Sequence, residues 1–163
     1  MQIRDALPGE LAEVGEIRIA AYRADGFLSP ASTYEPVLRG LGADGHGDVL
    51  VAERGAGLLG TVMLQYWPHA GRVVAGPDEA EIRALAVRPQ ARGAGLGRAL
   101  LSAVIARAAR RRVRHLVLFT QEDMKVAHRL YRDAGFSRLP DRDWKPEPDV
   151  TLLAYGLRLA ESP

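Results

Sequence analysis

The residue pattern with the clearest chemistry is a glycine-rich turn between an expected strand and an expected helix. Glycine occupies positions 93, 95 and 97, so the backbone N–H groups there can approach a ligand closely. The turn opens a helical pattern, and the unpaired amides and the dipole of a helix N-terminus attract anions. Arg88, Arg92 and Arg98 flank the turn and are able to add phosphate contacts. These residues predict a pyrophosphate-binding turn.

Two common nucleotide motifs do not fit this turn. A P-loop needs Lys and then Ser or Thr after its last glycine, whereas Gly97 is followed by Arg98 and Ala99. The dinucleotide fingerprint G-x-G-x-x-G needs a glycine where Arg98 stands, and an acidic residue about 20 positions further on. A nicotinamide-dinucleotide domain is therefore a remote alternative. A turn that only connects a strand to a helix is the structural alternative.

The elements around the turn follow from hydrophobic periodicity and from Gly and Pro breaks. Helical spacing predicts helices over 11–23 and 33–41, from about 96 to 108, and around 126–134. Apolar runs predict strands over 2–7, 48–53, 58–66, 80–87, 116–119 and 150–159. The segment 68–78, rich in Gly and Pro, is expected to be a flexible insertion. Strands mixed with helices in this order indicate an α/β or α+β sandwich.

The composition limits the class of protein. A chain of 163 residues, 47% hydrophobic and 26% charged, is expected to form one soluble domain over 1–163. A net charge of +2 gives no reason to expect a nucleic-acid or membrane partner. The sequence lacks cysteine, which excludes disulfides, thiolate metal sites and cysteine nucleophiles. No apolar run is long enough to span a membrane or to act as a signal peptide, so a cytoplasmic location is expected.

Two other groups of residues are interpreted as structural. The four histidines are scattered without metal-ligand spacing, so no metal site is expected. An arginine cluster lies at the expected C-terminal end of the helix that follows the turn, where the helix dipole stabilises positive charge. No aromatic residues interleave with these arginines, and a solvated face is the expected role for Arg107, Arg110, Arg111, Arg112 and Arg114.

Two segments together resemble the GNAT superfamily of N-acetyltransferases. Arg92-Gly93-Ala94-Gly95-Leu96-Gly97 looks like the family's Gln/Arg-x-x-Gly-x-Gly/Ala signature, and it follows an apolar strand and a proline. Downstream, the run from Ala127 to Phe136 resembles the family's A-x-x-L-Y-x-x-x-G-F segment. The two segments stand in the family's order and at its separation, and the flanking elements extend the resemblance over nearly the whole chain.

The resemblance implies a fold and a cofactor. The fold would be a mixed, mostly antiparallel central sheet with splayed parallel central strands, flanked by helices. The acyl donor would be acetyl-CoA, with its pyrophosphate on the turn Arg92, Gly93, Ala94, Gly95, Leu96, Gly97 and Arg98. The pantetheine arm would pair with the strand before the turn, beside Leu85, Ala86 and Val87, where a backbone N–H would also stabilise the developing oxyanion.

The same resemblance implies catalytic roles. Tyr131 aligns with the usual general acid, which protonates the departing thiolate, and a phenol suits this role at neutral pH. A tyrosine buried in the core is the alternative on helical spacing alone. Glu81 stands where the family often carries a general base, and Glu79, on the same strand face, is the second candidate. For both residues, the structural alternative is a solvated carboxylate at the end of a strand.

The sequence departs from the family at one position and leaves the acceptor open. Met124 stands where many relatives have an asparagine that contacts the cofactor. A non-catalytic acyl-CoA-binding module is therefore the alternative to an enzyme. The expected acceptor is an amine of a small molecule or peptide, reached by direct attack because no acyl-cysteine can form. A homodimer is possible. Aromatic residues that border the acceptor side in this fold are Tyr22, Phe27, Tyr66 and Trp144.

Overall fold

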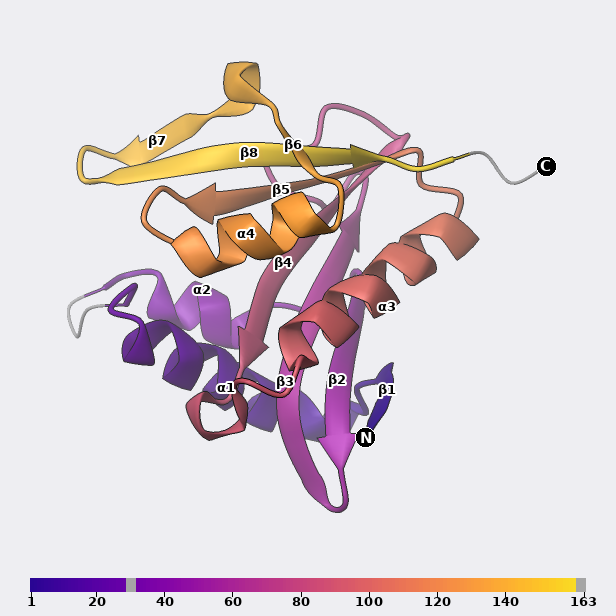
Figure 1. Ribbon diagram of the computed structural model, residues 1–163, viewed down its shortest axis with the longest axis vertical. Coiled ribbons are helices and arrows are strands. Elements are labelled where there is room, and N and C mark those ends of the chain that lie inside the picture. Colours follow the sequence, from indigo (N-terminus) through magenta and orange to yellow (C-terminus); the bar gives the residue numbers. More distant parts are fainter. Residues whose placement is uncertain (29–31, 161–163) are drawn as a thin grey trace. The chain divides into compact units, whose positions relative to one another are not determined.

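The computed structural model describes residues 1–28 and 32–160 (Figure 1). Its eight strands follow the hydrogen-bonded order β1-β2-β3-β4-β5-β8-β6, with β7 also paired to β8. β4 and β5 are parallel, whereas β5, β6 and β7 each pair with β8 in the antiparallel sense. The expected mixed, mostly antiparallel sheet with flanking helices is therefore confirmed. The strands are β1 (Gln2–Asp5), β2 (Asp48–Arg54), β3 (Gly57–Tyr66), β4 (Glu79–Val87), β5 (His115–Gln121), β6 (Ser137–Arg138), β7 (Trp144–Glu147) and β8 (Val150–Arg158).

The helices agree with the sequence periodicity in type and approximate position. They are α1 (Leu11–Ala24), α2 (Glu35–Gly40), α3 (Leu96–Arg110) and α4 (Lys125–Asp133), with short 3-10 turns η1 (Pro8–Glu10), η2 (Pro89–Ala91) and η3 (Pro140–Arg142). No helix in the part of the chain that the structure describes is long and apolar enough to cross a membrane.

The chain divides into two compact units built from interleaved segments. The first unit comprises Met1–Leu64 and Ala84–Val104, and the second comprises Gln65–Arg83 and Ile105–Pro163. β3, β4 and α3 each contribute residues to both units, because the division falls within these elements. The expectation of a single domain over 1–163 stays a prediction.

The first unit forms around one apolar stripe of α1. Val14, Ile17 and Ala21 repeat at helical spacing and pack against strand residues such as Val51 and Met63. Arg18 of the same helix is fully buried, and its guanidinium donates to the carbonyl oxygens of Leu38 (3.1 Å) and Leu41 (2.8 Å). This side chain therefore ties α1 to α2 and to the residue that follows it.

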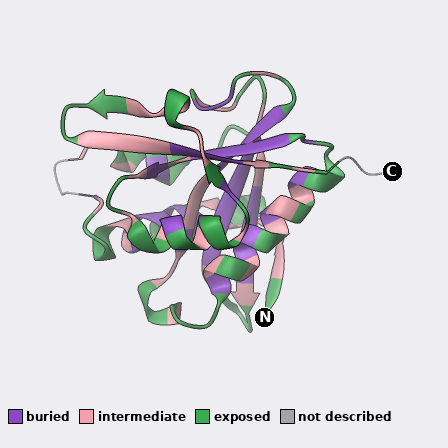
Figure 2. Ribbon diagram, turned by 45° about the horizontal axis from the view of Figure 1, so that its top comes forward, coloured by how far each residue is buried: buried purple, intermediate pink, exposed green. Residues whose placement is uncertain are grey.

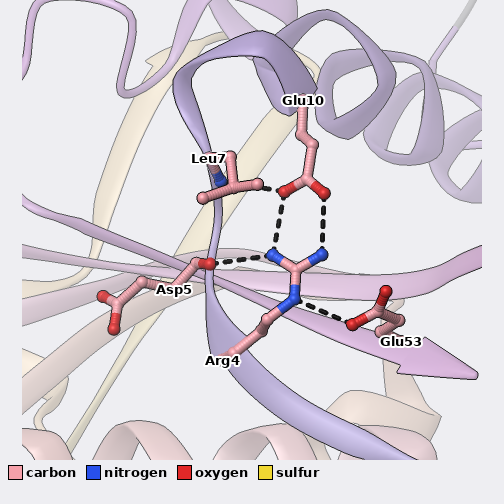
Figure 3. Close-up of polar contacts among 5 residues, drawn as sticks. All are labelled: Arg4, Asp5, Leu7, Glu10 and Glu53. Atoms are coloured by element: carbon pink, nitrogen blue, oxygen red, sulfur yellow. Dashed lines mark hydrogen bonds and ion pairs between the residues drawn. The ribbon is translucent and has the colours of Figure 1, made fainter.

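A charged contact fixes the N-terminal strand of this unit (Figure 3). The Arg4 guanidinium donates both Nη atoms to the Glu10 carboxylate at 2.7 and 3.0 Å, and its Nε donates to Glu53 at 2.8 Å. Glu10 also accepts the N–H of Leu7 at 2.8 Å. Arg4 thus joins β1, η1 and the end of β2.

The second unit is organised around β5, which is buried along most of its length, as its purple ribbon shows (Figure 2). β5 pairs with β8 from His115–Arg158 to Gln121–Leu152. β5 is longer at both ends than the strand expected over 116–119. β7 was not expected, because residues 140–148 look like a loop in sequence; the strand forms by pairing Trp144 with Leu152 and is largely exposed.

The segment 68–78 of the second unit is not the flexible insertion expected from its Gly and Pro content. Val73 and Val74 are buried and pack against Val117 of β5 and Ala154 of β8. Nearby, Trp144 stacks beside Phe119 with ring centroids 6.2 Å apart, and Arg72 lies over its ring at 4.7 Å. Apolar burial and a cation–π contact therefore hold the segment.

Candidate active site

The glycine turn of the first unit has the local geometry that anion binding requires. Gly93 and Gly95 have φ values of 86° and 77°, in the left-handed region where a side chain is disfavoured. A Cβ atom at either position would meet no atom within 4 Å, and residues 92–95 are exposed. Helix α3 begins directly afterwards, with the Ala99 N–H donating to the Gly95 carbonyl at 3.0 Å. Open space over exposed amides at the start of a 15-residue helix fits a pyrophosphate group.

Two of the three flanking arginines serve the packing of this unit. Arg92 pairs with both carboxylate oxygens of Asp25, at 2.6 and 3.0 Å, and Arg88 pairs with Glu13 at 2.9 Å. Arg88 also donates to the carbonyl of Leu58 at 2.6 Å. These bonds fasten the turn to α1 and β3, so phosphate contacts from either guanidinium would compete with an existing ion pair.

The strand segment before the turn carries an irregular residue. Ala84 has a φ of 53°, which costs an alanine about 1 kcal/mol or more and interrupts regular strand geometry. The expected pantetheine-binding residues follow it. Ala86 is buried in the α1 core, whereas Leu85 and Val87 are half-buried. An irregular backbone conformation at Ala84 therefore immediately precedes the segment assigned to the cofactor.

Glu81 of the second unit is a buried carboxylate. Its residue exposure is 4%, its Oε1 accepts the N–H of Gly71 at 2.8 Å, and Arg83 lies 3.9 Å away. Burial raises the pKa of the Glu81 carboxyl above its ordinary value, although the Arg83 charge and the Gly71 N–H act in the opposite direction. A carboxylate with a raised pKa is suited to accept a proton near neutral pH. The alternative interpretation, that Glu81 is a solvent-exposed carboxylate at a strand end, is therefore wrong.

Glu79 is buried as well, but its surroundings have the opposite effect. Its carboxylate accepts two bonds from Arg142 (2.7 and 2.9 Å), one from the Ala75 N–H (2.8 Å) and one from His115 Nδ1 (2.8 Å). Burial alone would raise the pKa of Glu79, but these donors outweigh burial and lower it to about 2. A carboxylate so fully engaged is a poor proton acceptor.

Tyr131 lies on α4 with its ring buried among aromatic residues. It is 7% exposed, and its ring centroid lies 5.8 Å from that of Phe136 and 6.3 Å from that of Tyr155. Burial raises the pKa of the Tyr131 phenol to about 12. The phenol therefore keeps its proton at neutral pH, as a proton donor must.

The start of α4 is held to the end of β5 by contacts of His128 and Met124. His128 is buried, stacks on Tyr155 at 5.7 Å, and donates from Nε2 to the Gln121 carbonyl at 2.8 Å. Burial lowers the pKa of His128, so the ring is neutral at physiological pH. Met124 precedes the helix, and the Thr120 hydroxyl donates to its sulfur at 3.7 Å. These contacts join α4 to the end of β5.

Some functional candidates had no signal in the sequence. Arg142 and His115 lie 63 and 36 residues from Glu79 in the sequence, and only the fold brings them into contact with its carboxylate. Among the aromatic candidates, Tyr66 lies beneath Arg111, with its ring centroid 5.9 Å from the guanidinium carbon. Trp67, the next residue along the chain, is 48% exposed. Within residues 1–28 and 32–160, no three His, Cys, Asp or Glu side chains gather as metal ligands would.

Comparison with models of known protein families assigns this chain to one family. The acetyltransferase (GNAT) family model matches residues 12–136, which includes the glycine turn and Tyr131. The chain belongs to this family, whose acetyltransferases take the acetyl group from acetyl-CoA. The recognised resemblance and the expected cofactor are thereby confirmed.

Individual relatives support the same assignment. The mycothiol acetyltransferase of Cellulomonas flavigena is 38% identical over 119 residues, which are 70% of this chain and 34% of the relative. The chain thus spans about a third of the length of that curated relative.

Solved structures share the fold at lower identity. A GNAT-family acetyltransferase from Staphylococcus aureus superposes with a TM-score of 0.77 at 17% identity, covering 98% of this chain and 99% of that one. A putative acetyltransferase from Salmonella typhimurium, solved with its cofactor acetyl-CoA, gives a TM-score of 0.72 at 24% identity and covers 100% and 96% of the two chains. These likenesses concern the fold.

Proposed function

We propose that this chain transfers an acetyl group from acetyl-CoA to a primary amine of a small molecule or peptide, by direct attack in a ternary complex. The observation that carries this proposal is the contrast between two carboxylates on one strand. Glu79 is saturated by donors and has a pKa of about 2, whereas burial raises the pKa of Glu81. Differently tuned carboxylates are typical of sites that perform proton transfer.

Backbone groups would hold the cofactor. The backbone amides of the turn and helix start from Arg92 to Arg98 would bind the pyrophosphate, and Leu85, Ala86 and Val87 would lie beside the pantetheine arm. Bound acetyl-CoA supplies an activated thioester, so the protein needs to provide proton transfer and orientation rather than activation.

Glu81 would act as the general base. An amine is protonated at neutral pH and must lose a proton before its lone pair can attack an acyl carbon. The Glu81 carboxylate would accept that proton, directly or through a water molecule. Because burial raises its pKa, it is a stronger base than an ordinary glutamate.

Tyr131 would act as the general acid. As the nitrogen–carbon bond forms and the carbon–sulfur bond breaks, the Tyr131 hydroxyl would give its proton to the departing sulfur. A pKa of about 12 keeps this hydroxyl protonated under all ordinary assay conditions. The sequence has no cysteine that could carry the acyl group as an intermediate, which supports direct attack by the amine.

The test is turnover with a panel of amines, followed by substitution of the base. The panel holds a polyamine, an aminoglycoside, amino acids, peptides and the acceptor used by the mycothiol acetyltransferases, and release of free coenzyme A thiol reports transfer. The protein gives no background with a thiol reagent because it lacks cysteine. Glu81→Gln should lower kcat/KM at neutral pH by about 10²-fold or more, whereas Glu53→Gln in the Arg4 cluster should retain it.

Two results would count against the proposal. If the protein binds acetyl-CoA but transfers acetyl to no amine in the panel, the chain is a non-catalytic acyl-CoA-binding module. If Glu81→Gln acetylates amines as fast as the wild type, transfer stands but the base is another group.

A further inference from the structure

A short segment of the second unit binds both strand carboxylates through its backbone. The strap, defined as Gly71–Ala75, donates the Gly71 N–H to Glu81 and the Ala75 N–H to Glu79, each at 2.8 Å. Between them, the Val73 carbonyl accepts a bond from Arg142 at 3.0 Å. The strap is closed as a turn by the Val74 N–H, which donates to the Gly71 carbonyl at 3.2 Å. Displacing one end of the strap would therefore move the other.

The centre of the strap is packed against the sheet. Val73 and Val74 are buried against Val117 and Ala154. Val117 is the register partner of Glu81, so this packing places the strap on the face of the sheet that carries the carboxylate. Apolar burial keeps the strap on the sheet, but it is not directional and does not aim an N–H group.

The Glu79–Arg142 pair supplies the directional contacts. Both carboxylate oxygens of Glu79 bind Arg142, and His115 Nδ1 holds one of them from β5. The Glu79 carboxylate is buried and the Arg142 side chain is half-buried. Such a pair is weak evidence for stability, because desolvation offsets much of its attraction and well-packed apolar residues often stabilise a protein equally. Its bidentate geometry, which fixes η3, β4 and the strap together, is the property that apolar residues would not supply.

The contact between the strap and Glu81 is unusually close. A Cβ atom added to Gly71 would lie 2.8 Å from Oε1 of Glu81, inside any normal contact distance. A side chain at this position would force the carboxylate at the end of the Glu81 side chain to shift, and glycine avoids that displacement. A small displacement of the strap would lengthen the 2.8 Å bond.

We infer that Glu79 and Arg142 are positioning residues, whose ion pair holds the strap so that the Gly71 N–H stays bonded to the Glu81 carboxylate. This inference rests on the proposed function only for its catalytic consequence. Arg83, on the same strand, is the charged group in contact with Glu81, at 3.9 Å. His115 from β5 and Arg142 from η3 contact Glu79, and the guanidinium of Arg72 on the strap lies over the Trp144 ring.

Replacement of Arg142 should therefore change the pKa of the Glu81 carboxyl. The Gly71 N–H favours the charged form of Glu81, so weakening that bond raises the pKa of the carboxyl further. In Arg142→Met, we expect the titration midpoint of Glu81 to rise by about one pH unit. If Glu81 is the base, the acid limb of kcat/KM should move upward by the same amount.

The experiment is a carbon-13 NMR titration of the glutamate side-chain carboxyls, with the pH profile of kcat/KM measured alongside. Glu81→Gln identifies the Glu81 resonance by its absence. Arg4→Met is the matched control, because it also removes an arginine bound to a glutamate through both Nη atoms, but in the first unit. Gly71→Ala is the second variant. It pushes a methyl group against Oε1 and displaces the N–H even if Arg142→Met fails to fold.

The outcomes separate the two ideas. An upward shift of the Glu81 midpoint in Arg142→Met or, if that variant does not fold, in Gly71→Ala, with none in Arg4→Met, supports the strap. A shift in the NMR titration without a change in the kcat/KM profile leaves the strap standing and removes Glu81 as the base. An unchanged Glu81 midpoint in folded Arg142→Met, or in Gly71→Ala where only that variant folds, overturns the inference.

Discussion

Glu81 and Tyr131 lie on opposite faces of the strands β4, β5 and β8 of the second unit. Glu81 is the register partner of Val117, whereas the next residue along β5, Leu118, is the partner of Tyr155, against which the Tyr131 ring packs. Successive residues of a strand point to opposite faces. Under the proposed function, the proton acceptor and the proton donor would therefore act from different sides of these strands.

Replacement of Tyr131 tests the donor. Tyr131→Phe keeps the ring in its aromatic cluster but removes the acidic proton, so kcat should fall by about 10²-fold while acetyl-CoA affinity changes little. Tyr155→Phe is the matched control, since it removes a hydroxyl from the ring stacked against Tyr131. Steady-state kinetics on both variants checks this. Equal losses in the two variants would assign the effect to packing.

Removal of the Glu81 charge should stabilise the protein at neutral pH. The folded-state pKa of Glu81 is raised, so the folded protein binds this proton more tightly than the unfolded chain does. Stability is therefore lost as pH rises from the ordinary pKa through the raised one. Glu81→Gln should raise Tm by a few degrees at pH 7 or above, and by progressively less as the pH falls toward about 4. Thermal melts over this range provide the test, and an equal effect at every pH would refute it.

Glu79 should have the opposite influence on acid stability. Its folded-state pKa of about 2 lies below the ordinary value of 4.5, so its contribution is present above pH 4.5 and is lost as the pH falls toward 2. Glu79→Gln should lower Tm at pH 7, and its Tm should fall less steeply between pH 5 and about 3 than that of the wild type. Parallel melting curves for the two proteins across this range would contradict the expectation.

The glycine turn predicts a binding defect that is separable from a folding defect. Gly95→Ala places a side chain at a φ of 77°, which costs stability, and covers backbone proposed to contact the cofactor. Gly55→Ala imposes a similar strain at a φ of 62° in the β2–β3 hairpin, where a Cβ would also meet no atom within 4 Å. Both variants should melt earlier, but only Gly95→Ala should bind acetyl-CoA about tenfold more weakly by calorimetry.

Much of the fold could be predicted because local patterns determine it. The α1 stripe of Val14, Ile17 and Ala21 shows helical periodicity in the sequence, and the same residues form a core in the structure. β7 could not be predicted in this way. Its sequence, Trp144 to Glu147, contains a proline and no alternation, and the strand exists only because β8 offers a partner.

The candidate site divides along the same line. The glycine turn is a local motif, and its positive φ values follow from its composition. The choice between Glu79 and Glu81 is not local, because the two residues stand on the same strand, two positions apart. Only the fold brings Arg142 to one carboxylate and leaves the other with a raised pKa. Both carboxylates are recognisable as candidates in the sequence, but they differ only in the partners that the tertiary structure brings to them.

The 2.8 Å separation between a Cβ at position 71 and Oε1 of Glu81 has an evolutionary consequence. A relative that replaces Gly71 with any larger residue must shorten or redirect the side chain at position 81, and a relative with a shorter residue at 81 is released from the need for glycine at 71. The two positions should therefore co-vary. Substitution at position 71 alone should mark lineages that have moved their proton acceptor elsewhere.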